Sequence, residues 1–411
     1  MLVGTGIGSE ARASSYGWER HDMAPTGWAR GAAALLLAAA VLVAGAPLAA
    51  ASGSGGRGSA KPGRLRAGRP GEVISATPII SPAGSRAWRV LYHSRAVDGR
   101  DVPVSGVIVA PTGKAPAGGR PVVSWAHGTH GLADACAPSR AIDVTYRLPG
   151  IRDFIKAGDV VVATDYEGLG TPGEHPYLIG VSEGRGVLDI ARAAQQLPGT
   201  NASANLLVYG HSQGGQAALF AGELAPTYAP ELHLLGIAAV APVSDVTTML
   251  PGATKIPALL GYVVMASVGL HAAYPSVDLS TVLTPQTLAH LSIVDQLCSD
   301  DIVDYYAQQP ASQVIVQNPV DVPAIAALEA QNRAGNGATA APLFVIQGDK
   351  DLLVPKSQTD QYVQRACALG DRVLYRVYPG QDHVGARDVS IRDVEAWFAD
   401  RVAGTPASST C

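Results

Sequence analysis

A serine between two glycines stands where a predicted strand turns into a predicted helix. Residues 210–214 have the pattern G-x-S-x-G, with an apolar run at 206–209 before them and an apolar stretch at 216–221 after them. Glycines allow a strained turn that presents the Ser212 hydroxyl at the start of the helix. A helix N-terminus carries partial positive charge and free N–H groups, which a developing oxyanion needs. We therefore predict that Ser212 is a nucleophile.

The acid that would assist this serine is expected further along the chain, before the histidine. Residues 343–347 are typical of a short apolar strand, and Asp349 and Asp351 follow it. We predict that Asp351 is the acid, because it fits the pattern G-x-x-D-x-x-V-P over residues 348–355, which is typical of the acid in serine hydrolases. Asp349 is the alternative, and its expected role is to shape the turn.

The histidine of the predicted triad follows the last predicted strand. Residues 373–378 alternate and are rich in β-formers, and the loop after them ends at His383. We predict that one imidazole nitrogen of His383 takes the Ser212 proton while Asp351 holds the other nitrogen. His211 points away from the nucleophile in such a turn, so its expected role is to support the turn.

A second turn, residues 127–131, follows a predicted buried strand at 121–126. A His-Gly turn at this place commonly supplies one N–H of an oxyanion hole, and the residue after the nucleophile supplies the other. We predict Gln213 and Thr129 as the two donors, and the Thr129 hydroxyl could add a further bond. The spacing also allows His130 or Gly131 in place of Thr129.

The remaining chain alternates between predicted strands and helices. The β-rich stretches between residues 71 and 111, including 88–97 and 102–110, suit an antiparallel start to a sheet. A helix at 151–157, a strand at 159–164, a helix at 182–197, a strand at 234–241 and a closing amphipathic helix at 387–402 follow. This order predicts an α/β fold with a mainly parallel central sheet and helices on both faces.

Residues 243–341 interrupt that alternation. Most connections are about six residues long, so this segment is an insert rather than a loop. It contains apolar stretches with helical character, such as 259–265 and 288–297. We predict a helical insert that overhangs Ser212 and acts both as a lid and as an acyl pocket. The alternative is a fixed structural cap.

Several of these segments together resemble a known family. The segments are residues 134–139, 164–170, 184–189 and 209–215, and the resemblance runs from about residue 76 to 398. The sequence resembles the secretory lipase family of α/β-hydrolases, the fungal lipase A-like enzymes with an inserted lid domain. The resemblance implies an extracellular carboxylic ester hydrolase acting on lipid esters, with Ser212, Asp351 and His383 matching the triad.

The chain has four cysteines, Cys136, Cys298, Cys367 and Cys411. An even number in an exported chain favours disulfides, and four cysteines allow three pairings. The sequence has no C-x-x-C pair or Cys/His cluster with zinc spacing, so we predict no metal and no cofactor. The family resemblance implies the pair Cys136–Cys298, which leaves Cys367–Cys411.

The N-terminal region has the pattern of an export signal. An apolar run at residues 32–51 ends in Ala-Ala-Ala, which predicts a signal peptide over residues 1–51 and a secreted, extracellular protein. Met23 is an alternative start, and an uncleaved membrane anchor is the alternative to cleavage. Residues 52–70, rich in Gly, Ser and Arg, predict a disordered linker. The hydrolase domain is then predicted at 71–404, with a C-terminal tail at 405–411.

The composition and charge of the chain limit the kinds of molecule that it is expected to bind. The 411 residues are 47% hydrophobic and 16% charged, which suffices for one large domain. The net charge of −4 makes a nucleic acid an unsuitable partner. Residues 168–173 fit G-x-G-x-x-G, but the proline-containing stretch after them does not open a helix, so we predict no dinucleotide site. The expected partners are an ester substrate and, transiently, a lipid interface; no protein partner is predicted.

These observations predict a secreted serine ester hydrolase, a triacylglycerol lipase or broad carboxylesterase that works through an acyl-enzyme. Three alternatives stay open: a serine exopeptidase, a small-ester carboxylesterase with a fixed cap, and a non-catalytic binding protein of the same fold. A peptidase of this kind needs a charged anchor for a free amine. The acidic residues of the insert, such as Asp278, Asp295 and Glu329, form no obvious cluster in the sequence.

Overall fold

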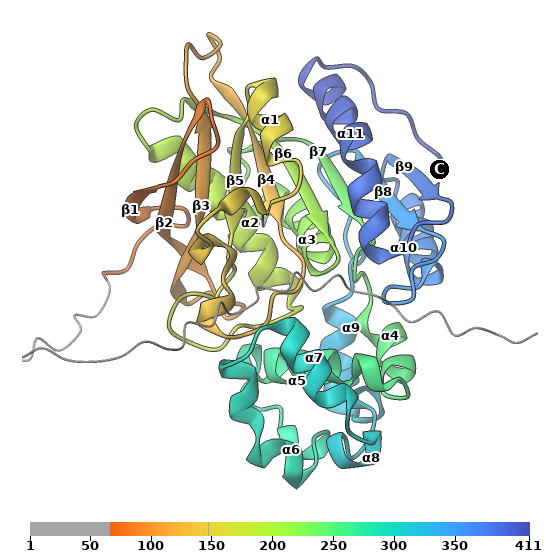
Figure 1. Ribbon diagram of the computed structural model, residues 1–411. Helices are drawn as coiled ribbons and strands as arrows, with labels where there is room; N and C mark the ends of the chain where they lie inside the picture. The colour runs from red at the N-terminus through yellow and green to blue at the C-terminus, as the bar shows by residue number, and fades with distance from the viewer. Residues whose placement is uncertain (1–65, 147) are drawn as a thin grey trace, which may run out of the picture. The chain divides into compact units, whose positions relative to one another are not determined.

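The computed structural model describes residues 66–146 and 148–411 (Figure 1). The predicted signal peptide, the alternative start at Met23 and the predicted linker as far as residue 65 lie outside the described residues. Gly68 belongs to the end of that predicted linker, yet its amide donates to Asp101 Oδ2 at 2.9 Å and its carbonyl accepts from Arg95. The chain is therefore fixed from at least this residue, earlier than the linker prediction allowed.

A nine-stranded sheet forms the centre of the domain, in the order β1-β2-β3-β5-β4-β6-β7-β8-β9. Neighbouring strands are antiparallel from β1 through β2 and β3 to β5. From β5 onwards, through β4, β6, β7 and β8 to β9, neighbouring strands are parallel, as predicted. The strands are β1 (Val73–Ile79), β2 (Ser85–Arg95), β3 (Asp101–Pro111), β4 (Arg120–Ala126), β5 (Val160–Thr164), β6 (Ala202–His211), β7 (His233–Val240), β8 (Leu343–Gly348) and β9 (Val373–Tyr378).

Helices cover both faces of this sheet, because successive side chains of a buried strand point to opposite faces. Along β6, Leu206 and Val208 pack with α2 (Gly180–Gln196), α3 (Gln213–Tyr228) and α10 (Lys356–Ala368). Leu207 and Tyr209 pack on the other face with α1 (Ile151–Ala157) and α11 (His383–Val402). The central strands therefore have no solvated face, which explains their continuous apolar sequences.

Helix α11 begins at His383, four residues before the predicted start at residue 387. The Asp382 carboxylate caps the helix by accepting a hydrogen bond from the Gly385 amide at 2.7 Å. The apolar pattern that predicts this helix starts only at Val389 and therefore does not extend to its first turn. The consequence is functional, because the helix start positions His383 itself.

A cap, which we define as residues 241–342 between β7 and β8, replaces the usual short connection. Its helices gather beyond one end of the sheet (Figure 1). They are α4 (Val246–Ala253), α5 (Leu260–Ala273), α6 (Pro285–Ala289), α7 (Ser299–Ala307), α8 (Ala311–Val314) and α9 (Pro323–Gln331). They share their own apolar cluster, in which Leu260, Val264 and Met265 are fully buried. In the described part of the chain, no helix is long and apolar enough to cross a membrane.

Two disulfides are present, Cys136–Cys298 and Cys367–Cys411, the pairs that the family resemblance implied. The first joins a 3-10 helix of the core, Asp134–Cys136, to the residue that precedes α7 of the cap. The second joins α10 to the last residue of the chain. The cap is thus covalently attached to the core at one point besides its two chain connections.

Candidate active site

Ser212 lies between β6 and α3 with a φ of +59°, which is uncommon for a residue with a side chain. The neighbouring glycines make this turn sterically feasible. A Cβ atom on Gly210 would lie 2.0 Å from the Gly214 oxygen, and one on Gly214 would lie 1.9 Å from the Ala126 oxygen. The Ser212 amide donates to the Val240 oxygen at 3.0 Å, which fixes the turn to the adjacent strand.

Asp351 accepts a hydrogen bond from His383 Nδ1 at 2.7 Å. Three further donors hold the same carboxylate: the amides of Leu353 and Val354 at 2.9 and 2.8 Å, and Gln347 Nε2 at 3.0 Å. Gln347 lies on β8, directly before the turn. Because each oxygen has at least two donors, the carboxylate has one orientation, and that orientation faces His383.

Asp349 has a different environment. Its side chain is exposed and accepts a hydrogen bond from the Gly380 amide at 2.6 Å, so it links the turn after β8 to the turn after β9. This contact matches the turn-shaping role expected for Asp349. Of the two competing aspartates, only Asp351 contacts His383.

The imidazole of His383 is oriented for proton transfer. Nδ1 faces a carboxylate, so Nδ1 carries the proton and Nε2 is the basic nitrogen. Nε2 is buried and has no hydrogen-bond partner, and within the described residues no hydrogen bond joins it to Ser212. His211 Nε2 lies 2.9 Å from the His383 carbonyl oxygen, with the two rings 4.6 Å apart. His211 therefore supports the start of α11, rather than only the turn at Ser212.

Side chains hold two carbonyl groups of the turn after β4. The His127 oxygen accepts from the Tyr166 hydroxyl at 3.0 Å. The Gly128 oxygen accepts from Nδ1 of His127 at 2.7 Å and from Nδ1 of His130 at 2.8 Å. In a trans peptide the next N–H points opposite to the carbonyl. The two histidines thereby fix the direction of the Thr129 N–H.

Of the three candidates for the first oxyanion donor, only Thr129 lines the pocket that contains Ser212. The His130 oxygen accepts a hydrogen bond from the Ser299 amide at 3.0 Å, and Gly131 forms a β-bridge with Cys298. Both residues therefore face the cap connection. The Thr129 hydroxyl is occupied, since it lies 2.7 Å from the Tyr177 hydroxyl.

Gln213 is the first residue of α3, where its backbone N–H has no intrahelical acceptor. Its side chain is buried and donates from Nε2 to Glu183 Oε1 at 2.7 Å and to His175 Nε2 at 3.0 Å. The sequence predicts a role for the backbone N–H of Gln213 but neither partner of its side chain. Glu183 and His175 lie 30 and 38 residues before it, and no sequence pattern links the three.

A pocket opens at Ser212, and within the described chain no charged residue contributes to its wall. The core contributes Thr129, Tyr177, Leu178, Ser212, Leu353 and Val354. The cap contributes Val243, Val246, Met249, Leu250, Ala253, Leu259, Tyr262, Val263 and Ala266. Ser212 therefore faces an apolar wall built mainly by α4 and α5.

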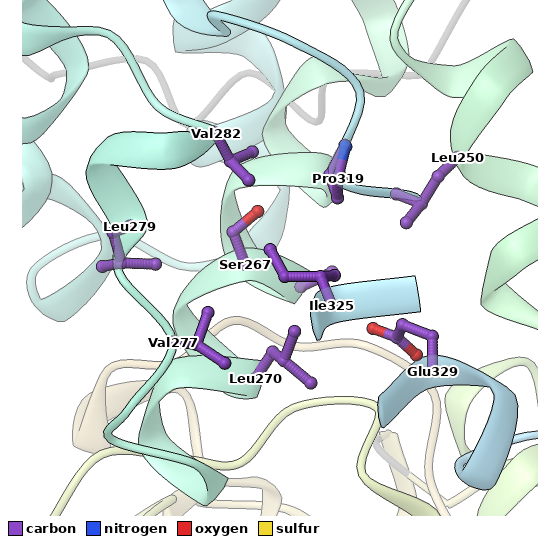
Figure 2. A pocket seen from close by; sticks show the side chains of 10 residues that line it. Leu250, Ser267, Leu270, Val277, Leu279, Val282, Pro319, Ile325 and Glu329 are labelled. Atoms are coloured by element: carbon purple, nitrogen blue, oxygen red, sulfur yellow. The ribbon is translucent and has the colours of Figure 1, made fainter. Parts of the chain in front are cut away.

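A second, much smaller cavity lies within the cap (Figure 2). It shares Leu250 and Ala266 with the pocket at Ser212, so these two side chains separate the two spaces. Figure 2 shows the carboxyl group of Glu329 among apolar side chains such as Ile325 and Leu270. Burial raises the pKa of Glu329 to about 7.

The acidic residues of the cap do not form a site. Asp278 and Asp295 are exposed, Glu329 is buried, and none of the three lines the pocket at Ser212. In the described part of the chain, no group of three or more His, Cys, Asp or Glu side chains is arranged to hold a metal ion. The pocket thus offers a substrate apolar contacts and the groups around Ser212.

A strained serine between strand and helix, on a mainly parallel sheet whose strand ends also carry the acid and the histidine, defines the α/β-hydrolase class. The model of the secretory lipase family matches residues 135–410. The chain belongs to the secretory lipase family, and it is a carboxylic ester hydrolase of the lipase and esterase type.

Individual relatives are distant but cover most of the chain. A lipase A of Arthroderma benhamiae is 26% identical over 378 residues, covering 84% of this chain and 77% of the relative. A probable inactive lipase of Mycobacterium tuberculosis is 24% identical over 368 residues, covering 82% and 79%. The closed structure of Candida antarctica lipase A has a TM-score of 0.73 at 20% identity and covers 84% of each chain.

Proposed function

We propose that this chain is a secreted lipase or broad carboxylesterase that hydrolyses esters with apolar acyl groups through an acyl-enzyme at Ser212. The observation that carries the proposal is the uncharged, largely apolar pocket whose wall contains Ser212. An acyl chain gains free energy in such a pocket through burial of its methylene groups. A charged amine would find no counter-charge there, which argues against an exopeptidase.

In the proposed mechanism, Ser212 Oγ attacks the ester carbonyl carbon while His383 Nε2 takes the hydroxyl proton. The Asp351 carboxylate stabilises the resulting imidazolium through its 2.7 Å contact with Nδ1. The carbonyl oxygen becomes an oxyanion and accepts hydrogen bonds from the N–H groups of Gln213 and Thr129. His383 then donates its proton to the departing alcohol, and the acyl group remains on Ser212.

Deacylation repeats these steps with water as the nucleophile. His383 Nε2 removes a proton from water, and the hydroxide attacks the acyl carbon within the same oxyanion site. The tetrahedral intermediate collapses, Ser212 Oγ regains its proton from His383, and the carboxylic acid leaves. Each step uses the same three side chains, so loss of any one affects both half-reactions.

Secretion is part of the proposal. The signal-peptide pattern before residue 52, two disulfides and a family described as secretory support it. Disulfides persist in oxidising compartments and are rare in the cytosol. Cell fractionation with N-terminal sequencing of the exported protein tests this part. Retention of residues 32–51 in a membrane fraction would indicate an anchor instead.

One observation favours a fixed cap, and with it a small-ester carboxylesterase. The Cys136–Cys298 disulfide and the hydrogen bond from the Ser299 amide to the His130 oxygen attach the cap to the turn beside Ser212. These contacts restrict cap movement at the start of α7. A fixed cap would limit substrates to acyl groups that fit the present pocket, whereas a moving lid would admit longer chains.

The decisive experiment compares initial rates on p-nitrophenyl esters and on aminoacyl p-nitroanilides for the wild-type protein. We expect ester hydrolysis that is abolished in Ser212→Ala, and no cleavage of the anilides. Preferential anilide cleavage would indicate an exopeptidase. An inactive wild-type protein would contradict catalysis altogether, an outcome worth testing because one relative carries the name of a probable inactive lipase.

A further inference from the structure

Two buried polar side chains, Glu183 and His175, contact the side chain of Gln213, and neither of them lines the pocket at Ser212. Glu183, in the first turn of α2, is fully buried, and its Oε1 atom accepts hydrogen bonds from Gln213 Nε2 at 2.7 Å and from the Leu178 amide at 2.9 Å. His175 is buried beside it, with Nε2 3.0 Å from the same Gln213 nitrogen. No step of the proposed mechanism uses Glu183 or His175.

The protonation of His175 follows from its other contact. Its Nδ1 atom lies 2.8 Å from the Glu167 carbonyl oxygen, which can only accept. Nδ1 of His175 therefore carries the ring proton, and Nε2 accepts a hydrogen bond from the side-chain amide of Gln213. The two N–H bonds of the Gln213 side chain are then both used, one by His175 and one by Glu183. This arrangement fixes the rotation of the amide as well as its position.

We propose that Glu183, assisted by His175, is a positioning residue of the oxyanion hole, which holds Gln213 so that its backbone N–H meets the oxyanion. The proposal rests on the proposed function, because it concerns one of the two donors named there. Gln213 directly follows the strained Ser212, and strained backbone persists only where the surroundings hold it. The hydrogen bonds of the Gln213 side chain fix the residue immediately after that strain.

The carboxyl group of Glu183 is also connected to Thr129, the second proposed donor, through the segment that contains Leu178. Leu178 has a φ of +60°, another left-handed backbone with a bulky side chain, and it lines the pocket. Its amide is bound by Glu183, and its carbonyl oxygen accepts from Asn332 Nδ2 at 2.6 Å. The preceding residue, Tyr177, contacts the Thr129 hydroxyl. Glu183 therefore links the two segments that carry the proposed oxyanion donors.

The protonation state of Glu183 is compatible with a position close to the proposed oxyanion donors. Burial raises the pKa of Glu183 to about 8, so it is mostly protonated at neutral pH. Among the described residues its Oε2 atom has no hydrogen-bond partner, and Oε1 accepts both donors. A neutral group avoids a second negative charge behind the site where the oxyanion develops. A glutamine would keep the acceptor oxygen, the shape and the neutrality.

The test compares Glu183→Ala, Glu183→Gln and Gln213→Ala with a matched control, Glu223→Ala. Glu223 lies on α3 like Gln213, and burial raises its pKa to about 7. Its carboxylate accepts from the amides of Gly335 and Gly337 at 2.7 and 3.2 Å, away from Ser212. The control thus removes a partly buried acid that holds two backbone amides but touches no proposed oxyanion donor. Each variant is assayed for kcat and KM on a p-nitrophenyl ester, for inhibition by a trifluoromethyl ketone, and for Tm.

We expect Glu183→Ala to lower kcat about 10- to 100-fold, below the cost of removing a donor outright, while KM changes less than about threefold. The affinity for the ketone, which forms a tetrahedral adduct, should fall in parallel. Gln213→Ala should show the same loss, and the double variant no further loss. Glu183→Gln should stay within about threefold of wild type. Glu223→Ala should lower Tm and leave kcat within about threefold.

Three outcomes would overturn the inference: an active Glu183→Ala enzyme with unchanged kcat, kcat losses of equal size in the Glu223→Ala control, or additive losses in the double variant. If Glu183→Ala does not fold, Gln213→Ala carries the test, and unchanged kcat in that variant contradicts the proposal. An inactive wild-type protein would overturn the proposed function together with this inference. An active wild type with an unaffected variant contradicts the inference alone.

Discussion

The two sides of the pocket at Ser212 are held together in different ways. On the core side, hydrogen bonds fix single groups: Asp351 accepts from three donors besides His383, and both side-chain N–H bonds of Gln213 are used. On the cap side, the wall consists of apolar side chains such as Met249 and Tyr262 that pack without directional contacts. Proton transfer and oxyanion binding depend on positions within a fraction of an ångström, whereas burial of an acyl chain depends mainly on area.

This contrast separates two kinds of mutational effect. A change on the core side removes a group from a defined geometry, so its effect on rate should be large and abrupt. A change on the cap side alters how much apolar surface a substrate buries, so its effect should be small and graded with substrate size.

Removal of the nucleophile should have the largest effect. Ser212→Ala should fold normally, because the hydroxyl has no hydrogen-bond partner within the described residues. Ester hydrolysis should fall by several orders of magnitude, since only binding and the oxyanion hole remain. The measurement is kcat on a p-nitrophenyl ester, with labelling of Ser212 by a serine-directed phosphonate in the wild type. Substantial activity in a contamination-free alanine variant would remove Ser212 from the mechanism.

The two aspartates after β8 should differ sharply. Asp351→Asn places an amide opposite His383 Nδ1, which disfavours the required tautomer, and we expect a loss on the order of 10³–10⁴ in kcat. Asp349→Asn changes only an exposed turn contact with Gly380 and should cost less than about tenfold. The pair of variants is its own control, because the residues are two positions apart. The reverse ranking would contradict the triad assignment.

Ionisation of Glu329, in the cap, should affect the stability of the folded protein rather than the reaction rate. The folded-state pKa of Glu329 is about 7, above its ordinary value of 4.5, so the stability linked to the neutral acid is fully present below pH 4.5 and is lost as pH rises through 7. Glu329→Gln should therefore match the wild type in Tm near pH 4.5 and exceed it at pH 8.5. The full difference is on the order of 3 kcal/mol at most. Parallel Tm curves across this range would show that Glu329 does not titrate in this way.

Ionisation of Glu183, in the core, should have a smaller effect, and this effect should be on the reaction rate. Ionisation of Glu183 near pH 8 places a charge behind the developing oxyanion, so kcat of the wild type should fall several-fold above that pH. The titratable groups that face it, His175, Tyr166 and Tyr177, stay neutral there, because burial lowers the pKa of the histidine to about 4 and raises those of the tyrosines well above their usual range. Glu183→Gln should show a flat profile. An alkaline fall of equal size in both proteins would assign it to another group.

The sequence predicted the parts of the site that follow from strand order. Ser212, Asp351 and His383 each come just after a predicted parallel strand, and such strands end at the same side of a sheet. The contact of 2.7 Å between Asp351 and His383 agrees with that reasoning. The start of α11 at residue 383 was missed, because the capping contact of Asp382 lies before the apolar pattern.

The side-chain contacts of Gln213 and Thr129, the proposed oxyanion donors, could not be predicted from the sequence. Glu183 and His175 meet Gln213 only after α2 packs on α3, and neither stands in a motif that requires a partner. The direction of the Thr129 N–H depends on two histidine contacts to one carbonyl oxygen, which spacing alone does not specify. Local patterns predict the candidate reacting groups, whereas tertiary packing determines which side chains contact them.

Changes in acyl chain length should produce the smallest changes in kcat/KM. They test the role of the cap directly, because the cap forms most of the pocket wall. Each methylene buried against the apolar wall contributes at most about 0.8 kcal/mol, so kcat/KM should rise by no more than about fourfold per methylene. The rise should continue from acetate esters to medium and long chains, including triglycerides. A lid that moves would expose apolar surface, and a lipid interface would favour that open state. Rates should then increase above the solubility limit of the substrate.

The measurement is a series of p-nitrophenyl esters from acetate to oleate, assayed below and above that limit, in wild type and in Leu250→Trp. Leu250 lines both the pocket at Ser212 and the second cavity, so a larger side chain there should shorten the usable chain without affecting acetate. A variant that loses acetate hydrolysis as well would show that the cap also positions the reacting groups. Activity confined to acetate and butyrate, with no rise at the interface, would identify a small-ester carboxylesterase whose cap is fixed. In that case the Cys136–Cys298 attachment would restrict access to Ser212 as well as link the cap to the core.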